Sequence, residues 1–144
     1  MSSGVGNFGS RDWHESFAGR GIVYDLAHVA LNATDAAERE RAVVALGKSD
    51  DPRAVRPLVD LLRDKDPNIR LGAIDALGQI RSGRSVDDLI GKLKDKNEEI
   101  AIRRRVIFAL AAIRSTGAVR GLEEFMADED EDAGLRSCAE RLLS

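Results

Sequence analysis

The 144-residue sequence contains few aromatic residues, cysteines, histidines or prolines. With six aromatic residues in all, its core has to be built from alanine and aliphatic side chains, a composition that suits packed helices. Its single cysteine excludes an internal disulfide, and that cysteine with two histidines cannot supply the four ligands of a structural zinc site. No apolar run approaches the ~20 residues that span a bilayer, and the start lacks a secretory-signal pattern, so we expect a cytoplasmic protein.

The sequence repeats itself. The apolar positions of residues 55–62 recur 31 residues later and again 33 residues after that, and a weaker copy precedes them. Within each copy the apolar residues are three and four positions apart, which is typical of helices and not of strands. We therefore predict an all-α solenoid (α-α superhelix) of four stacked helix pairs over residues 20–144. The four copies are 20–50, 51–82, 83–116 and 117–144.

Glycine and proline positions agree with this periodicity. Asp66 precedes Pro67, which indicates a capped helix start. Gly83 and Gly117 follow the second helices of two copies, where we expect left-handed helix ends. In the Ala-Leu-Gly motif of two copies, Gly47 and Gly78 are expected to let neighbouring helices approach closely.

These features resemble the HEAT-repeat family, and in particular the HEAT-like repeats named after phycobilisome lyases. The resemblance covers about 20–144 and rests on Asp66-Pro67-Asn68-Ile69-Arg70, Ala73, Ala76-Leu77-Gly78 and the lead-in Ala54-Val55-x-Pro57-Leu58. It implies second helices that line the concave side of a superhelix, and an Asp–Arg ladder between adjacent repeats. It is specific for the fold and weak for function, because one fold serves many functions.

The expected ladder rests on an aspartate and an arginine four positions apart. The pairs are Asp35 with Arg39, Asp66 with Arg70, and Asp132 with Arg136. The resemblance implies that each aspartate caps its helix while the arginine reaches across the stack. In the third copy Arg103 follows Asn97 by six residues, so a rung there is left open and a looser joint is expected. The alternative is a set of ordinary surface pairs, each worth about 0–1 kcal/mol.

A candidate partner-binding surface lies off the core stripe of the second helices. Helical spacing places Leu71, Asp75, Arg104, Arg105 and Phe108 there, and exposed apolar residues in such a place can mark a binding patch. The alternative is that Leu71 and Phe108 pack between neighbouring repeats.

The run from Arg103 to Arg105 raises nucleic-acid binding as a further alternative. The resemblance extends to HEAT-like DNA glycosylases, which grip a duplex with this fold. The third copy has eight basic and five acidic residues, but the acidic run 128–132 follows in the next copy. Phosphate binding needs a broad basic face, so we expect no nucleic-acid partner.

No catalytic, cofactor or metal constellation is evident. Cys138 has no histidine near it in the sequence, and the glycines of residues 4–9 match G-x-G-x-x-G without a preceding strand. HEAT-like deoxyhypusine hydroxylases, which this repeat resembles, bind iron through repeated His-Glu pairs. Here His14-Glu15 is the one such pair, and His28 has no adjacent glutamate.

Residues 1–19 precede the repeats and hold three of the six aromatic residues. Trp13 and Phe17 would share one face of a helical turn, so this segment either caps the first repeat or is a free motif. The function we predict is a non-catalytic interaction module that binds another protein on its concave face. The alternative is a bilin lyase-type subunit or chaperone. Pairing of the terminal repeats with a second copy is left open.

Overall fold

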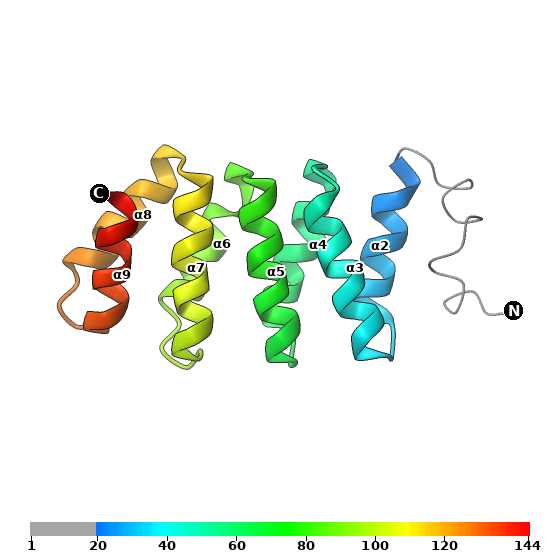
Figure 1. Ribbon diagram of the computed structural model, residues 1–144, viewed down its shortest axis with the longest axis horizontal. Helices are drawn as coiled ribbons and strands as arrows, with labels where there is room; N and C mark the ends of the chain where they lie inside the picture. Colours follow the sequence, from blue (N-terminus) through cyan, green and yellow to red (C-terminus); the bar gives the residue numbers. More distant parts are fainter. Residues whose placement is uncertain (1–19) are drawn as a thin grey trace, which may run out of the picture.

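The computed structural model describes residues 20–144. In this part of the chain eight α-helices form four successive pairs, joined by short turns and three-residue 3-10 segments (Figure 1). The first helices of the pairs are α2 (Arg20–Asn32), α4 (Val55–Asp60), α6 (Val86–Leu93) and α8 (Thr116–Ala127). The second helices are α3 (Ala36–Lys48), α5 (Pro67–Ile80), α7 (Ile100–Ile113) and α9 (Ala133–Leu143). The 3-10 segments are η2 (Pro52–Ala54), η3 (Leu61–Arg63) and η4 (Gly83–Ser85).

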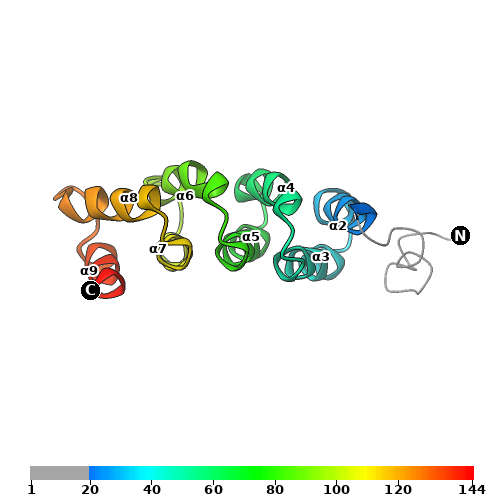
Figure 2. The same cartoon turned by 90° about the horizontal axis from the view of Figure 1, so that it is seen from above.

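The helices lie in two rows (Figure 2). The first helices form one row and the second helices form the other, and the array bows gently so that the second-helix row lies on its inner side. With no strand among residues 20–144, the all-helical solenoid predicted from the repeat is confirmed.

A single apolar cluster runs between the two rows from one end of the array to the other. Equivalent residues of successive copies, such as Leu58, Leu89 and Leu122, are fully buried in it. Pro57 lies in the first turn of α4, where its missing N–H removes no helical hydrogen bond. Each repeat therefore completes its core against its neighbours, as in other stacked-repeat proteins.

The second-helix row is packed at backbone contact. A Cβ added to Gly47 would lie 2.9 Å from the Cβ of Ala76, and one added to Gly78 would lie 3.1 Å from the Cα of Ala109. Both distances are too short for an unstrained contact, so the close approach predicted at Gly47 and Gly78 is confirmed.

The left-handed helix ends are not at the expected glycines. The non-glycine residues with positive φ among residues 20–144 are Asp50 (53°), two residues after α3, Arg81 (61°), which follows α5, and Arg114 (52°), which follows α7. Gly83 instead begins η4, and Gly117 lies in the first turn of α8. After α5 and after α7 the left-handed residue is the first one beyond the helix. The cost of the left-handed backbone is offset at Arg81, whose Nε donates to the carbonyl of Ala112 at 3.1 Å.

The last repeat departs from the others at one core position. Val43, Ile74 and Ile107 occupy equivalent places in the second helices of three copies, and all three are buried. The equivalent residue of the fourth copy is Glu140, which is exposed. The edge beyond α9 is therefore more polar than the joints between repeats.

Candidate protein-binding face

The second-helix arginines of all four repeats are anchored in the same way. Each uses its guanidinium to donate a hydrogen bond to a backbone carbonyl of its own repeat, either in the last turn of the first helix or in the segment that joins the two helices. The donor and acceptor pairs are Arg39 with Ala30 (2.8 Å), Arg70 with Asp64 (2.8 Å), Arg103 with Leu93 (2.7 Å) and Arg136 with Glu131 (3.2 Å). In the first three repeats this bond holds the arginine in place while its guanidinium reaches the next repeat.

Three of these arginines also bind a carboxylate of the following repeat. Arg39 pairs with Asp64, Arg70 pairs with Glu98 at 2.9 Å, and Arg103 pairs with Glu131 at 2.6 Å. We call these three ion pairs the arginine ladder. For Arg136 the structure gives no carboxylate partner within residues 20–144.

The capping aspartates are not the acids of this ladder. Asp35, Asp66 and Asp132 each accept a hydrogen bond from a backbone N–H in the first turn of the helix they precede. Their carboxylates are therefore used locally. The acids that reach the arginines are one or two residues upstream of the helix caps, a place that the four-residue spacing does not indicate.

The rung left open in the third copy is present. Because η3 directly extends the first helix of the second copy, the third copy has a longer non-helical segment between its two helices, and in it Glu99 takes the N-cap position without a side-chain capping bond. Glu98 meets Arg70, and Lys92 also donates to it at 3.0 Å. On the other side of the repeat, Arg103 and Glu131 are only 4% and 6% exposed, and the Arg103 guanidinium lies 5.9 Å from the centre of the Phe125 ring.

The ladder holds two of its acids in the charged form. Burial would raise the pKa of Asp64, but hydrogen bonds from Arg39 and from the amide of Asp66 outweigh burial and lower the pKa overall. Burial would likewise raise the pKa of Glu98, but bonds from Arg70, the Glu99 amide and Lys92 lower it below its usual value. Both carboxylates are therefore matched to cations in the folded chain.

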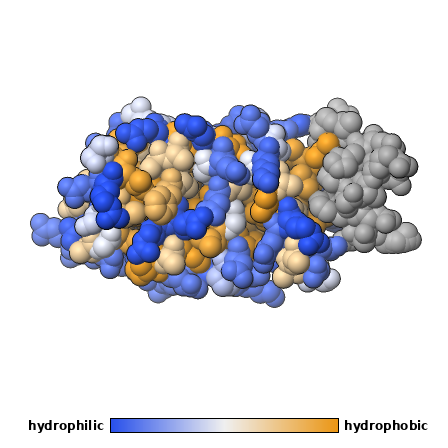
Figure 3. Space-filling model, viewed as in Figure 1, coloured by the Kyte–Doolittle hydropathy of each residue, from blue (hydrophilic) through white to orange (hydrophobic). Residues whose placement is uncertain are grey.

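The candidate surface lies on the second-helix face, the side formed by α3, α5, α7 and α9 and shown in Figure 3. Phe108 is 43% exposed there. Arg105 and Asp75 join α7 to α5 through an exposed ion pair of 2.6 Å. Arg104 is exposed, whereas Leu71 is half-buried against the core. The face also presents Val44 of α3, which is 51% exposed. Val44 is equivalent to Asp75 and Phe108 in the repeat, but it is not among the residues predicted from the sequence.

Three of the five candidate residues line one groove between α5 and α7. The groove has a volume of about 450 Å³, and its lining residues are Asp75, Gly78, Gln79, Arg105, Phe108, Ala109 and Ala112. Its lining combines small residues with the aromatic ring of Phe108 and the Arg105–Asp75 ion pair. This arrangement can accept an apolar side chain while polar groups at the rim fix its orientation.

The arginine run does not form one basic patch. Arg103 points into the ladder and is buried, whereas Arg105 is paired with Asp75. Within residues 20–144 only Arg104 of the three has no ion pair or side-chain hydrogen bond. The broad basic face that phosphate binding needs is therefore not formed by this run.

The remaining candidate groups in the sequence are the single cysteine, the possible metal ligands and the aromatic residues near the start. Cys138 is buried in the core, where it acts as a small apolar residue. Within the described part of the chain, no group of three or more His, Cys, Asp and Glu side chains is arranged to hold a metal ion. His14-Glu15, Trp13 and Phe17 lie outside the described residues. No helix among residues 20–144 is long and apolar enough to cross a bilayer.

This architecture can be compared with known sequences, solved structures and protein families. A search of curated protein sequences finds no match. Among solved structures, human deoxyhypusine hydroxylase in complex with glycerol superposes with a TM-score of 0.75 at 24% sequence identity, a likeness that shows the fold alone. The match covers 84% of this chain and 42% of the hydroxylase chain. The family model of HEAT repeats matches residues 25–101, more than half of the sequence, and the chain therefore belongs to the HEAT-repeat family.

Proposed function

We propose that this chain is a non-catalytic module that binds another protein on its second-helix face. The observation that carries the proposal is the exposure of Phe108 beside the groove between α5 and α7. An aromatic ring held on a rigid helix loses little conformational freedom on binding, and such rings are frequent anchors of protein interfaces. Val44 extends the apolar surface toward the first repeat.

Charge on the same face favours an acidic partner. Arg104 is exposed and Arg105 is available at the rim once a carboxylate competes with Asp75. A partner that uses these arginines should bind less tightly as salt concentration rises, because exposed charges are screened. An affinity that does not change with salt concentration would exclude recognition through these arginines.

Photo-crosslinking tests the location of the partner. A benzoyl-phenylalanine in place of Phe108 should form a crosslinked product in extracts of the native cell, and an excess of the unmodified chain should compete it away. The matched control places the same group at Arg120, an exposed residue of α8 in the other row. Equal crosslinking from both positions would contradict binding on the second-helix face.

A point substitution then measures the contribution of the ring. Phe108→Ser removes an exposed aromatic side chain and should leave the helix folded. For the partner identified by crosslinking, we expect the affinity to fall at least tenfold, the size of a typical interface hot spot. An unchanged affinity would mean that Phe108 does not anchor the partner.

The phycobilisome-lyase type of the repeat stays a prediction. A bilin lyase-type subunit or chaperone would give a visible absorption band after mixing with a bilin, and an interaction module would give none. Cys138, the one cysteine, is buried, so covalent attachment to it would require the last helix to open. Activity of the kind named for the human hydroxylase is not part of the proposal, because the structural likeness carries the fold alone.

A further inference from the structure

A glycine in the interior of α6 has no structural explanation. Gly91 lies within the helix Val86–Leu93, where glycine is less stabilising than alanine because it orders a more flexible backbone. Gly47 and Gly78 are required by close helix contact, but a Cβ added to Gly91 would meet no atom within 4 Å. The equivalent residues of the neighbouring copies are Asp60 and Glu124. The packing of residues 20–144 therefore does not require glycine at this position.

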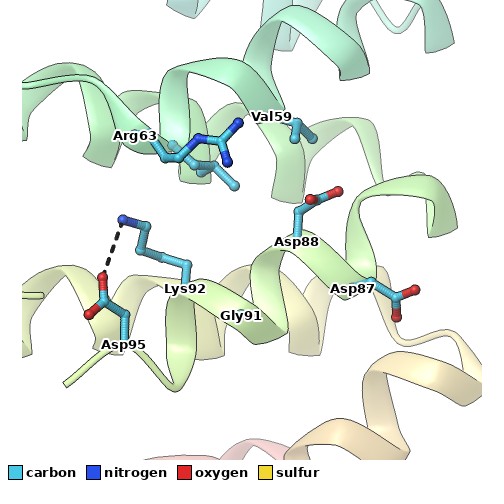
Figure 4. A pocket seen from close by; sticks show the side chains of 8 residues that line it. Val59, Arg63, Asp87, Asp88, Gly91, Lys92 and Asp95 are labelled. Carbon is cyan, nitrogen blue, oxygen red and sulfur yellow. Dashed lines mark ion pairs between the residues drawn. The ribbon is translucent and has the colours of Figure 1, made fainter. Parts of the chain in front are cut away.

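Gly91 lies in a groove on the first-helix row, between α6 and the α4–η3 segment (Figure 4). This groove has a volume of about 390 Å³, and its lining residues are Val59, Leu62, Arg63, Asp87, Asp88, Gly91, Lys92 and Asp95. Val59 and Leu62 make it apolar on one wall. Asp88 and Arg63 point into the space from opposite walls, and the backbone of Gly91 is uncovered between Asp88 and Lys92.

The groove continues past Asp88 along the same two helices. A second hollow of about 290 Å³ shares Val59 and Asp88 with the first, and its other lining residues are Pro52, Arg53, Val55, Arg56 and Arg84. The two hollows adjoin at Val59 and Asp88, and we call them together the α4–α6 groove. It lies on the opposite row of helices from Phe108.

The charges of the α4–α6 groove alternate along its length. Arg56 and Arg84 line one end, Asp87 and Asp88 line the middle, and Arg63 lines the other end. None of these five side chains has an ion pair or a side-chain hydrogen bond within residues 20–144. Lys92, by contrast, is occupied by Glu98. Unpaired charges that are basic at one end, acidic in the middle and basic at the other end are complementary to a chain with acidic, basic and acidic groups in that order.

The dimensions suit an extended peptide. The eight residues of α6 span about 12 Å at 1.5 Å per residue, which is the length of about four residues of extended chain. A bare helix backbone at Gly91 lets a peptide main chain approach more closely than any other residue would allow. Apolar contact with Val59 and Leu62 would supplement the charge pairs.

We propose that the α4–α6 groove binds an extended segment of a second protein, with a basic residue at Asp88, a small residue over Gly91, and acidic residues toward Arg84 and Arg63. The site is separate from the second-helix face and does not depend on the function proposed above. A chain with both sites holds two proteins on opposite sides of one thin array, which is the activity of a scaffold.

Two blocked synthetic peptides test the proposal by NMR titration of the full chain. The first is Glu-Ala-Lys-Ala-Glu, whose symmetric charges fit either chain direction, and the second is the charge-reversed Lys-Ala-Glu-Ala-Lys. We expect saturable shifts of the Arg63, Asp88 and Gly91 amides with the first peptide, and at least tenfold weaker binding of the second.

Substitutions at Gly91 separate binding from folding. Gly91→Ala and Gly91→Gln add side chains into open space, so both variants should melt at or above the temperature of the unmodified chain. Affinity for Glu-Ala-Lys-Ala-Glu should fall stepwise from glycine to alanine to glutamine, with at least a tenfold loss for Gly91→Gln. Gly83→Ala, another exposed glycine with no atom near its Cβ and outside the groove, should bind as the unmodified chain does.

Three outcomes would overturn the proposal. They are the absence of saturable shifts with Glu-Ala-Lys-Ala-Glu, equal binding of the charge-reversed peptide, and unchanged affinity in Gly91→Gln. None of these outcomes would bear on binding at Phe108, which lies on the other row.

Discussion

Replacing Arg103 by methionine measures the strength of the arginine ladder at its most buried rung. The substitution keeps an unbranched apolar side chain but removes the guanidinium, so Glu131 loses a partner 2.6 Å away and the Leu93 carbonyl loses a donor 2.7 Å away. Since Glu131 is 6% exposed, water cannot readily replace the lost bonds. Removing one member of a buried ion pair costs about 3–5 kcal/mol, a large part of the ~5–15 kcal/mol that stabilises a domain.

The assay is thermal and urea unfolding followed by circular dichroism. At about 3 °C per kcal/mol for a chain of this size, Arg103→Met should lower Tm by about 10–15 °C. Arg105→Met is the matched control. Arg105 also forms a 2.6 Å ion pair across two repeats, but the side chains of Arg105 and Asp75 are 44% and 43% exposed, so the expected cost is about 0–1 kcal/mol.

The double variant Arg103→Met with Glu131→Gln completes the test. Removing the second charge should recover part of the loss, because an unpaired buried carboxylate is the main cost. If Arg103→Met and Arg105→Met lower the free energy of unfolding equally, burial does not determine the strength of the ladder, and the reasoning is refuted.

Three further predictions follow from the packing and the charges. Gly47→Ala should destabilise the chain by about 1–3 kcal/mol in urea unfolding, because the new methyl would lie 2.9 Å from the Cβ of Ala76 and the helices would have to separate; a neutral effect would contradict backbone contact. Because the pKa values of Asp64 and Glu98 are lowered in the folded chain, the unfolded chain takes up protons first, and stability should fall as the pH drops below about 4. Glu98→Gln should make the free energy of unfolding less dependent on pH. An unchanged slope of this free energy between about pH 5 and 3 would contradict a stabilising role for the charged Glu98. Glu140→Ile should restore the apolar pattern at the edge beyond α9 and promote self-association, measured by sedimentation velocity. If the variant stays strictly monomeric, the charge of Glu140 is not what prevents two copies from associating through this edge.

The repeat pattern was sufficient to predict the fold because each helix pair carries the same signal. Buried leucines recur at fixed offsets, and glycines mark the tight joints at Gly47 and Gly78. The positions of Arg39, Arg70, Arg103 and Arg136 could also be predicted, because all lie at the same place in a regular helix.

The acids of the ladder could not be predicted in the same way. Asp64, Glu98 and Glu131 lie in turns of unequal length, and the arginine-to-acid separation is 25 residues for the first pair and 28 for the other two, so the four-residue spacing does not indicate them. The left-handed ends at Arg81 and Arg114 were missed because nearby glycines gave a stronger local signal. The groove at Gly91 was missed because the absence of a neighbour around a glycine is a property of the assembled array, not of the sequence.

The two rows differ in that the second-helix row is in close contact at Gly47 and Gly78, whereas the first-helix row holds an open hollow beside Gly91. Since α3, α5 and α7 already touch backbone to side chain at Gly47 and Gly78, the second-helix row can act as a spine about which the repeats pivot. Any bending of the array then opens or narrows the hollows of the first-helix row, such as the one beside Gly91. A peptide bound in this hollow would make the solenoid stiffer. It would also fix the curvature of the second-helix face, on which Phe108 lies.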